Sequence, residues 1–419
     1  MSKPKVHNWW VFSTYFAEGL PYSIIAAIPA IMFRDMRVDL SIIGFMSLLS
    51  IPWVIKFLWA PFIDSFLTLR KWLVYTELAL TLVFALLAIS LFQSSLAPII
   101  FLLGIGALFS ATHDISVDGF YMDALDDSSQ KSAIGFRVLS YRIALAVGSG
   151  VIVSMGTMFS WRCAYGAASL MMLVLFIIHR FMLPPSPVKE QTSQGFETLT
   201  KAFRSYFNKK GIAVILLFIV FLRAGEYMLG LMRGPFMVDL GIKVHIGWIS
   251  AAVAIPFSIL GAISGGAIIS KFSIKKTGIP IILFQNFTNL LYAALAFFYS
   301  GTVAQNILSP NSINPGKIGI ILAATVNAIE SFSSGMGTAL LMIVLIKMCD
   351  KEFKAAHYAI GSGFMALSGA ILNSVGGVAA QSMGYGWFFI ISFLVAMPAI
   401  PAFSARFTIF SATDQSEVG

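Results

Sequence analysis

Residues 183–210, LPPSPVKEQTSQGFETLTKAFRSYFNKK, interrupt a chain that is otherwise a succession of apolar runs. Three prolines, a polar stretch and the basic run from Arg204 to Lys210 give this segment the character of a linker. It divides the chain into two sets of six apolar runs, each long enough to cross a bilayer as a helix. We therefore predict a six-helix bundle over 1–183, a cytoplasmic linker over 184–210 and a second six-helix bundle over 211–419.

The twelve predicted spans are bounded by charges, prolines and glycines. Those of the first set cover 9–33, 42–63, 72–92, 98–124, 133–158 and 161–183. Those of the second set cover 211–237, 246–270, 278–300, 316–346, 356–382 and 386–409.

The composition supports an all-α integral membrane protein. Of the 419 residues, 58% are hydrophobic and only 11% are charged, and the mean hydropathy is +0.85. Soluble domains have about 45–50% apolar and about 25% charged residues. This balance excludes a soluble enzyme, a nucleic-acid-binding protein and a disordered chain. The two cysteines, Cys163 and Cys349, are far apart, so we expect neither a disulfide framework nor a metal site.

The basic residues predict the orientation in the membrane. Of the 28 Lys and Arg residues, 19 fall in loops on one side, 5 in loops on the other and 4 inside helices. Because loops rich in Lys and Arg remain in the cytoplasm, both termini and the linker are predicted to be cytoplasmic. The net charge of +9 thus reports orientation rather than a surface that binds polyanions.

The two halves carry similar markers at equivalent places. Asp35 lies 17 residues before Pro52, and Asp239 lies 17 residues before Pro256. Both prolines follow an isoleucine. Two parallel six-helix repeats joined by a cytoplasmic linker are similar to the major facilitator arrangement, in which the solute binds between the repeats.

Several ionisable residues fall inside predicted spans. A charge at the centre of a membrane helix costs about 2.5–3.5 kcal/mol, so such residues are candidates for function. Asp114 and Asp118 are four residues apart and share one helix face, and Arg223 and Glu226 are three apart and close enough to pair. The alternative is that these charges are structural ion pairs between helices. His113 is expected to be a hydrogen-bonded helix histidine.

Four strings of sequence resemble a known family. They are YFAEGLPYSI (15–24), KFLWAPFID (56–64), ATHDISVDGFYMDAL (111–125) and ESFSSGMGTALL (330–341). Together and in this order they resemble the AmpG-type muropeptide permeases, a family of major facilitator proteins related to acetyl-CoA transporters. The resemblance implies proton symport of anhydro-muropeptides across the bacterial inner membrane. It departs at 64–71, DSFLTLRK, where only Asp64 and the Arg70-Lys71 pair match the general facilitator loop.

These observations assign candidate roles in a transporter that works on a small, amphiphilic, anionic solute, with protons and membrane lipid as its other partners. No cofactor, metal, catalytic residue or nucleic acid is expected, and we expect a monomer. The proton-coupling candidates are Asp114 or Asp118 paired with Arg142, then Glu18, with Glu330 in reserve. The substrate-binding candidates are Arg223, Glu226, Tyr15, Tyr22, Tyr141, Asn286 and Asn327. The gating candidates are Asp64, Arg70 and Lys71.

Other functions remain open at this point. A siderophore, drug or acyl-CoA transporter would share the same scaffold, because a fold alone does not determine the solute. A membrane-embedded transferase would have to use His357 and Cys349, which lack the surroundings of a nucleophile and base. A sensor without transport activity would carry a large soluble domain, for which the sequence has no segment.

The orientation predicts a labelling pattern. In a variant without Cys163 and Cys349, a cysteine in place of Ser94 or Ser312 should react with an impermeant maleimide added to intact cells. A cysteine in place of Ser193 should react only after the cells are opened. Labelling of position 193 from outside would contradict the predicted orientation.

Overall fold

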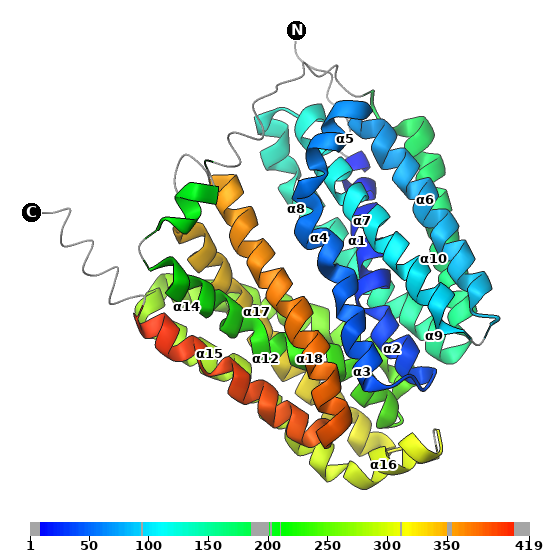
Figure 1. Ribbon diagram of the computed structural model, residues 1–419, viewed down its shortest axis with the longest axis vertical. Helices are drawn as coiled ribbons and strands as arrows, with labels where there is room; N and C mark the ends of the chain where they lie inside the picture. The colour runs from blue at the N-terminus through cyan, green and yellow to red at the C-terminus, as the bar shows by residue number, and fades with distance from the viewer. Residues whose placement is uncertain are drawn as a thin grey trace, which may run out of the picture. The chain divides into compact units, whose positions relative to one another are not determined.

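The structure of the chain is a computed structural model that describes residues 9–93, 95–185, 201, 203–209, 211–310, 312–349 and 354–405. Within these ranges every regular element is a helix (Figure 1). Eleven stretches of the described residues are long and apolar enough to cross a membrane, which makes the protein multi-pass. The last of them, Ile360–Ala405, is 46 residues long, about 69 Å at 1.5 Å per residue and too long for one crossing.

Gly384 divides this last stretch into two spans. Its backbone (φ 77°, ψ 165°) is not helical and is readily adopted only by glycine. Figure 1 shows the orange arm before Gly384 and the red arm after it running in opposite directions. The break falls between the predicted spans 356–382 and 386–409. The prediction of an all-α fold with twelve spans is therefore confirmed.

The chain forms two compact units. Unit 1 comprises Met1–Met32, Leu49–Thr192 and Val244–Ala251, and unit 2 comprises Phe33–Leu48, Ser193–Lys243 and Ala252–Gly419. The boundary near residue 192 falls inside the predicted linker 184–210, most of which lies outside the described residues. Residues 33–48 of the first sequence repeat belong to unit 2, and residues 244–251 of the second repeat belong to unit 1.

Unit 1 is a bundle in which α1 packs against α7 and α8, and α6 packs against α7 and α10. Its core contains Trp10, Tyr15, Leu73 and Phe120, all buried. Its main helices are α1 (Trp9–Ala26), α4 (Ile51–Ile55), α5 (Ala60–Phe66), α6 (Leu69–Ser90), α7 (Leu96–Ala124), α8 (Asp127–Ala146), α9 (Val153–Met158), α10 (Trp161–Met182) and the short α13 (Ile246–Trp248). The helix α2 (Ile28–Asp35) begins in unit 1 and ends in unit 2.

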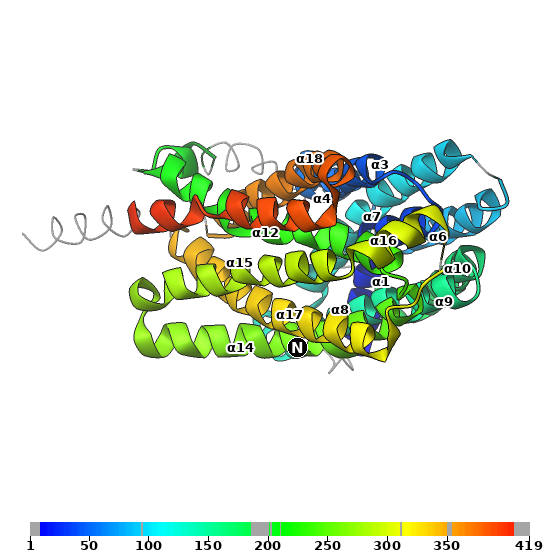
Figure 2. The same ribbon diagram turned by 90° about the horizontal axis from the view of Figure 1, so that it is seen from below.

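Unit 2 is a bundle in which α12 packs against α18, α14 against α17, and α15 against both α17 and α18 (Figure 2). Phe218, Leu222, Leu340 and Phe403 are buried in its core. Its helices are α3 (Leu40–Phe45), α12 (Ile212–Asp239), α14 (Ile255–Phe272), α15 (Ile274–Phe298), α16 (Ser300–Leu308), α17 (Gly316–Lys347) and α18 (Lys354–Ala396).

The second span of each repeat is broken at the repeated Ile-Pro. A 3₁₀ segment, Met46–Ser50, precedes α4, and a π-helical segment, Ile249–Ala254, precedes α14. Pro52 and Pro256 both occupy the first turn of the helix that follows, where the missing N–H costs nothing. The predicted span 42–63 is thus several short helices, and Lys56 lies in a second 3₁₀ turn, Lys56–Leu58.

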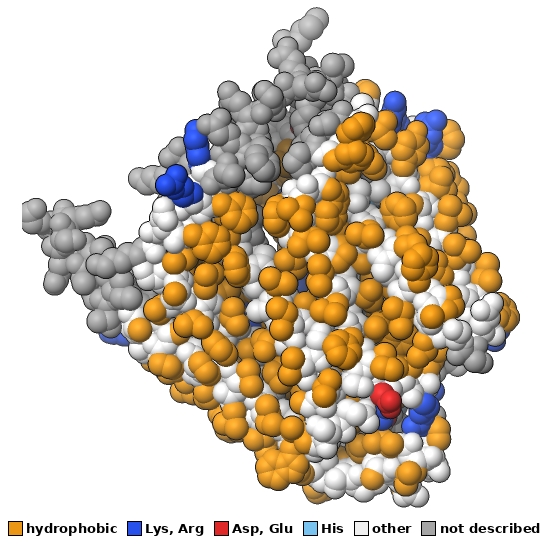
Figure 3. Space-filling model, in the orientation of Figure 1, with side chains coloured by type: hydrophobic (Ala, Val, Ile, Leu, Met, Phe, Trp, Pro, Cys, Tyr) orange, Lys and Arg blue, Asp and Glu red, His pale blue; other side chains and the backbone are white. Residues whose placement is uncertain are grey.

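The surface of the helices is apolar, as a lipid environment requires. Figure 3 shows hydrophobic side chains over much of the drawn face, with Lys and Arg near the helix ends. Large side chains such as Phe298 on α15 and Phe181 on α10 are exposed.

Close packing between α14 and α17 depends on glycine. A Cβ atom on Gly261 would lie 1.9 Å from the carbonyl oxygen of Phe332, so no larger residue fits without a shift of the backbone. A Cβ atom on Gly335 of α17 would likewise lie 2.1 Å from the carbonyl oxygen of Ser258. Small residues are typical of such contacts in membrane proteins, where backbones approach closely.

Gly261→Ala should therefore destabilise unit 2 by about 1–3 kcal/mol, the usual cost of overpacking. The measurement is the midpoint of thermal unfolding in detergent. Gly266→Ala is the matched control on the same helix, because a Cβ atom there would meet nothing within 4 Å. Equal midpoints for the two variants would contradict this account of the contact.

Candidate functional site

Charged and phenolic side chains of unit 1 gather on the facing sides of four of its segments. Tyr15 and Glu18 lie on one face of α1, and Asp114 and Asp118 lie on one face of α7. Lys56 comes from the 3₁₀ turn after α4, and Arg137 comes from α8. We refer to these six residues as the unit 1 cluster.

Asp118 is the centre of the unit 1 cluster. Its Oδ1 accepts a hydrogen bond from the Tyr15 hydroxyl at 2.7 Å and lies 2.8 Å from Nη2 of Arg137. The Arg137 guanidinium also lies over the Tyr15 ring, 4.5 Å from its centroid, and 5.6 Å from that of Tyr121. These contacts hold the arginine between α1 and α7 by both charge and ring stacking.

The other two acids of the unit 1 cluster differ from each other. Asp114 forms an ion pair with Lys56. Glu18 is only 7% exposed, and its Oε2 is buried without a hydrogen-bond partner among the described residues. Asp118, Arg137 and Lys56 are close enough to Glu18 to interact with it electrostatically. The unit 1 cluster thus holds three acids and two bases, and Glu18 is the acid in excess.

Two arginines of α12 form ion pairs in unit 2. Arg223 pairs with Glu226, as their spacing predicts, and its Nη1 donates to Thr338 Oγ1 at 3.1 Å. Both oxygens of Glu226 accept further hydrogen bonds, from Gln285 at 2.7 Å and from Ser334 at 2.6 Å. α15 and α17 supply these neutral partners.

The second pair of unit 2 joins α12 to α17. Nη1 of Arg233 lies 2.7 Å from Oε2 of Glu330, which also accepts a hydrogen bond from Ser331 at 3.3 Å. Arg233 is 28% exposed, the most accessible of these four charges. We refer to Arg223, Glu226, Arg233 and Glu330 as the unit 2 cluster; it contains two acids and two bases.

A third set of charges in unit 2 lies around the end of α12. Nε of Arg34 donates to both carboxylate oxygens of Asp239, at 2.9 and 2.7 Å, and the Tyr385 hydroxyl donates to Oδ2 at 2.7 Å. Nζ of Lys243 lies 2.7 Å from Oδ1 of Asp35. We refer to Arg34–Asp239 and Asp35–Lys243 as the reciprocal ion pairs.

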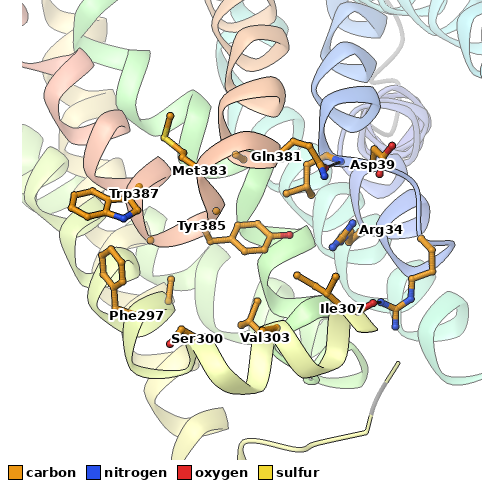
Figure 4. Close-up of a pocket in the computed structure, with 17 residues that line it drawn as sticks. Arg34, Asp39, Phe297, Ser300, Val303, Ile307, Gln381, Met383, Tyr385 and Trp387 are labelled. Carbon is orange, nitrogen blue, oxygen red and sulfur yellow. Dashed lines mark hydrogen bonds between the residues drawn. The ribbon is translucent and has the colours of Figure 1, made fainter. Parts of the chain in front are cut away.

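A cavity of about 440 Å³ in unit 2 is lined by Arg34 and Tyr385 of this set. Figure 4 shows the Tyr385 hydroxyl turned toward Arg34, with Gln381 above and residues of α16 below. Phe297 and Trp387 line its far end (Figure 4).

Residues 11–326 match the sequence profile of the Major Facilitator Superfamily. The chain belongs to this superfamily. The match covers three quarters of the protein and confirms the family to which the helix count and the repeats point.

Known facilitators with similar sequences include the anhydromuropeptide permease of Escherichia coli K12. It is 24% identical over 92% of this chain and 76% of its own length. A Rickettsia conorii protein named AmpG 4 is 23% identical over 93% of this chain and 94% of its own length. The resemblance of the four strings to AmpG-type permeases is thus confirmed across nearly the whole chain.

Solved facilitator structures share the fold at low sequence identity. A crystal structure of the nucleoside transporter NupG superposes with a TM-score of 0.71 at 15% identity, covering 95% of this chain and 99% of that one. An auto-inhibited peptide transporter of the POT family gives 0.59 at 12% identity, covering 95% and 96%.

The predicted pairing of Asp114 or Asp118 with Arg142 is wrong. Asp118 pairs with Arg137 and Asp114 with Lys56, rather than either with Arg142. Among the described residues, Arg142 has no acidic group within 4 Å. Arg137 is one of the 19 basic residues that the loop count assigns to the cytoplasmic side, because it lies four residues after the start of the predicted span 133–158. In the structure α8 begins at Asp127, and Arg137 lies ten residues into this helix, where it contacts Asp118 of α7.

The predicted substrate residues fall into two groups. Tyr22 and Tyr141 are partly exposed and lie near each other, with ring centroids 6.5 Å apart. Tyr15, Asn286 and Asn327 are each 1% exposed and have internal partners. Tyr15 donates to Asp118, Asn286 to the carbonyl of Ile282, and Asn327 to the Tyr292 hydroxyl. Their hydrogen bonds indicate positioning of helices and of the charged groups.

The predicted gating residues are only partly described. Asp64 lies in α5, but its side chain is outside the described part of the structure. Arg70 donates to the carbonyl of Arg180 at 2.9 Å, and Lys71 lies in the first turn of α6. The gating role of this loop remains a prediction.

The sequence did not predict a buried polar contact in unit 1 or the ion pairs that Arg34 and Asp35 form. Nδ1 of His179 on α10 lies 2.5 Å from Oε1 of Glu77 on α6, and both are fully buried. His113 shares a hydrogen bond with Thr76, as expected of a helix histidine. In the described part of the chain, no set of three His, Cys, Asp or Glu residues is arranged to hold a metal ion.

Proposed function

We propose that this facilitator is a proton-coupled importer of an amphiphilic, anionic organic solute of the anhydro-muropeptide kind, located in the bacterial inner membrane with both termini in the cytoplasm. Its similarity to the anhydromuropeptide permease of Escherichia coli supports the choice of solute. The excess of lysine and arginine in one set of loops supports the orientation.

The assignment of proton coupling depends on Glu18, whose buried Oε2 has no hydrogen-bond partner among the described residues. An ionised carboxylate is costly to bury without a cation or hydrogen-bond donors. The two bases of the unit 1 cluster are already paired with Asp114 and Asp118. Glu18 is therefore the acid of this cluster best placed to hold a proton and to release it when Lys56 or Arg137 changes partner. Asp114 and Asp118 serve as the groups that keep those two bases engaged.

The unit 2 cluster suits a solute that carries carboxylate groups. Arginine binds carboxylates through forked hydrogen bonds. Arg223 and Arg233 are each held by a glutamate, so a carboxylate of the solute would exchange with Glu226 or Glu330 without leaving an arginine unpaired. Ser334, Thr338 and Gln285 around Arg223 offer hydroxyl and amide groups to sugar hydroxyls and peptide bonds.

Exchange of partners at Arg233 would also link solute binding to protons. When a solute carboxylate displaces Glu330, that glutamate loses its cation inside the bilayer. A proton then removes the uncompensated charge. This makes Glu330 the second coupling candidate, in the unit that binds the solute.

The alternative is a facilitator for a siderophore, a drug or an acyl-CoA. Each of these solutes can carry anionic groups that arginines would bind, and the fold is shared by carriers of different solutes. The charges of the two clusters alone do not separate these solutes from a muropeptide.

The coupling proposal predicts a split between two transport modes in proteoliposomes. Glu18→Gln should reduce pH-driven accumulation of a radiolabelled anhydro-muropeptide at least tenfold while solute exchange remains near the native rate, because the amide cannot carry a proton. Glu330→Gln, Asp114→Asn and Asp118→Asn are measured in parallel.

Glu77→Gln provides the matched control, since Glu77 is a fully buried acid of unit 1 that contacts His179 and belongs to neither cluster. It should retain both transport modes. If all four cluster amides accumulate solute with the native pH profile, proton coupling through these acids is wrong.

The choice of solute predicts a ligand-dependent thermal shift. A ligand at 100 times its Kd stabilises the native state by about 2.7 kcal/mol. Purified protein should show a raised unfolding midpoint with anhydro-muropeptides, and no shift with ferric siderophores or acyl-CoA. A shift with one of the latter two and none with anhydro-muropeptides would favour the alternative.

A further inference from the structure

The two aspartates of the reciprocal ion pairs occupy equivalent positions in the two sequence repeats. Asp35 is the last residue of α2 and Asp239 is the last residue of α12, each 17 residues before the Ile-Pro proline of its repeat. Six spans separate the two positions along the chain, so both helices cross the membrane in the same direction. Their ends therefore face the same side, which the basic residues predict to be the outside.

Helix capping does not explain these carboxylates. The C-terminal end of a helix carries a partial negative charge, so an aspartate there is unfavourable by itself. Each aspartate instead binds a basic residue of the other repeat: Asp239 binds Arg34, and Asp35 binds Lys243. Each repeat thus supplies one acid and one base to the other. This symmetry indicates that the two aspartates connect segments of the two repeats and do not stabilise their own helices.

Further contacts hold the same segment of the first repeat within unit 2. The backbone N–H of Leu40 donates to Gln381 at 2.9 Å, and Ser47 lies 3.2 Å from Ser374. A Cβ atom on Gly44 would be 2.7 Å from Cα of Gly377, so α3 and α18 are in backbone contact. These contacts explain why residues 33–48 belong to unit 2 rather than to unit 1.

We propose that the reciprocal ion pairs, with Tyr385 as a second partner of Asp239, hold the outer side closed and separate once in each transport cycle. This inference rests on the proposed function only in requiring alternating access. Alternating access moves one repeat of a facilitator against the other, and both pairs join residues of the two repeats, so the proposal requires them to separate when the outer side opens. The four charged residues and Tyr385 are positioning residues of that cycle.

Ion pairs suit a contact that must open and re-form. When the outer side opens, water reaches the separated charges and solvates them, which lowers the cost of breaking a pair that is buried when closed. The cavity beside Arg34 and Tyr385 leaves space on one side of the pair. These two side chains can therefore turn away from Asp239 without displacing tightly packed neighbours.

A charge-swap experiment tests the proposal. In a variant without Cys163 and Cys349, Ser334→Cys reports access to the unit 2 cluster from an impermeant maleimide added to intact cells. Arg34→Asp and Asp239→Arg should each raise the labelling rate at least fivefold. The double variant Arg34→Asp/Asp239→Arg should return it to within twofold of the parent. The same pattern is expected for Asp35→Lys, Lys243→Asp and their combination.

Asp39→Lys is the matched control, because Asp39 is exposed in the same loop and forms no ion pair within 4 Å among the described residues. It should leave labelling unchanged. If a charge reversal prevents folding, Tyr385→Phe and Lys243→Gln replace it, because they keep most of the side-chain volume. Each should raise the labelling rate two- to threefold.

Three results would overturn the proposal: unchanged labelling in the folded single variants, double variants that label as fast as the single ones, or an equal rise in Asp39→Lys. Labelling requires neither solute nor a proton gradient. Its outcome is therefore independent of whether the solute and the coupling ion are correctly assigned.

Discussion

The cost of an uncompensated charge inside the bilayer governs the arrangement of polar groups in both units. Lys56–Asp114, Arg137–Asp118 and Arg233–Glu330 each join residues of different spans, so every pair also ties two helices together. Removing one partner of a fully buried ion pair costs about 3–5 kcal/mol, because it leaves an uncompensated buried charge. In the proposed transport cycle, protons and anionic solutes would exchange partners at the same contacts that join the helices.

The apolar runs were sufficient to predict the all-α membrane fold, because each run depends on the chemistry of a contiguous segment. Gly384 shows the same: a glycine between two apolar runs predicts where one span ends and the next begins. The spacing of Arg223 and Glu226 predicted their pairing, since residues three apart on a helix are neighbours whatever surrounds them.

Contacts between helices were harder to predict, because they depend on the depth and rotation of each span. The predicted span 133–158 leaves Arg137 only four residues from its start, so Arg142, deeper in the same span, was the expected partner of Asp118. Asn286 and Asn327 are polar residues in spans, but both are buried: Asn286 donates to the carbonyl of Ile282 in its own helix, and Asn327 donates to Tyr292 of a neighbouring helix. Asp35 and Asp239 were visible as a repeat. Their basic partners were not, because each comes from the other repeat.

The two reciprocal ion pairs are equivalent in sequence but unequal in surroundings, and this difference orders their roles. Arg34 and Asp239 have side chains 8% and 1% exposed, while Lys243 and Asp35 are 23% and 17% exposed. A solvent-exposed pair contributes about 0–1 kcal/mol, whereas a buried pair depends on good geometry and on further hydrogen bonds. Asp239 accepts a three-centre hydrogen bond from Nε of Arg34 and a further hydrogen bond from Tyr385. Arg34–Asp239 therefore determines which arrangement is stable, and Asp35–Lys243, which water reaches more easily, contributes mainly long-range attraction as the two segments approach each other.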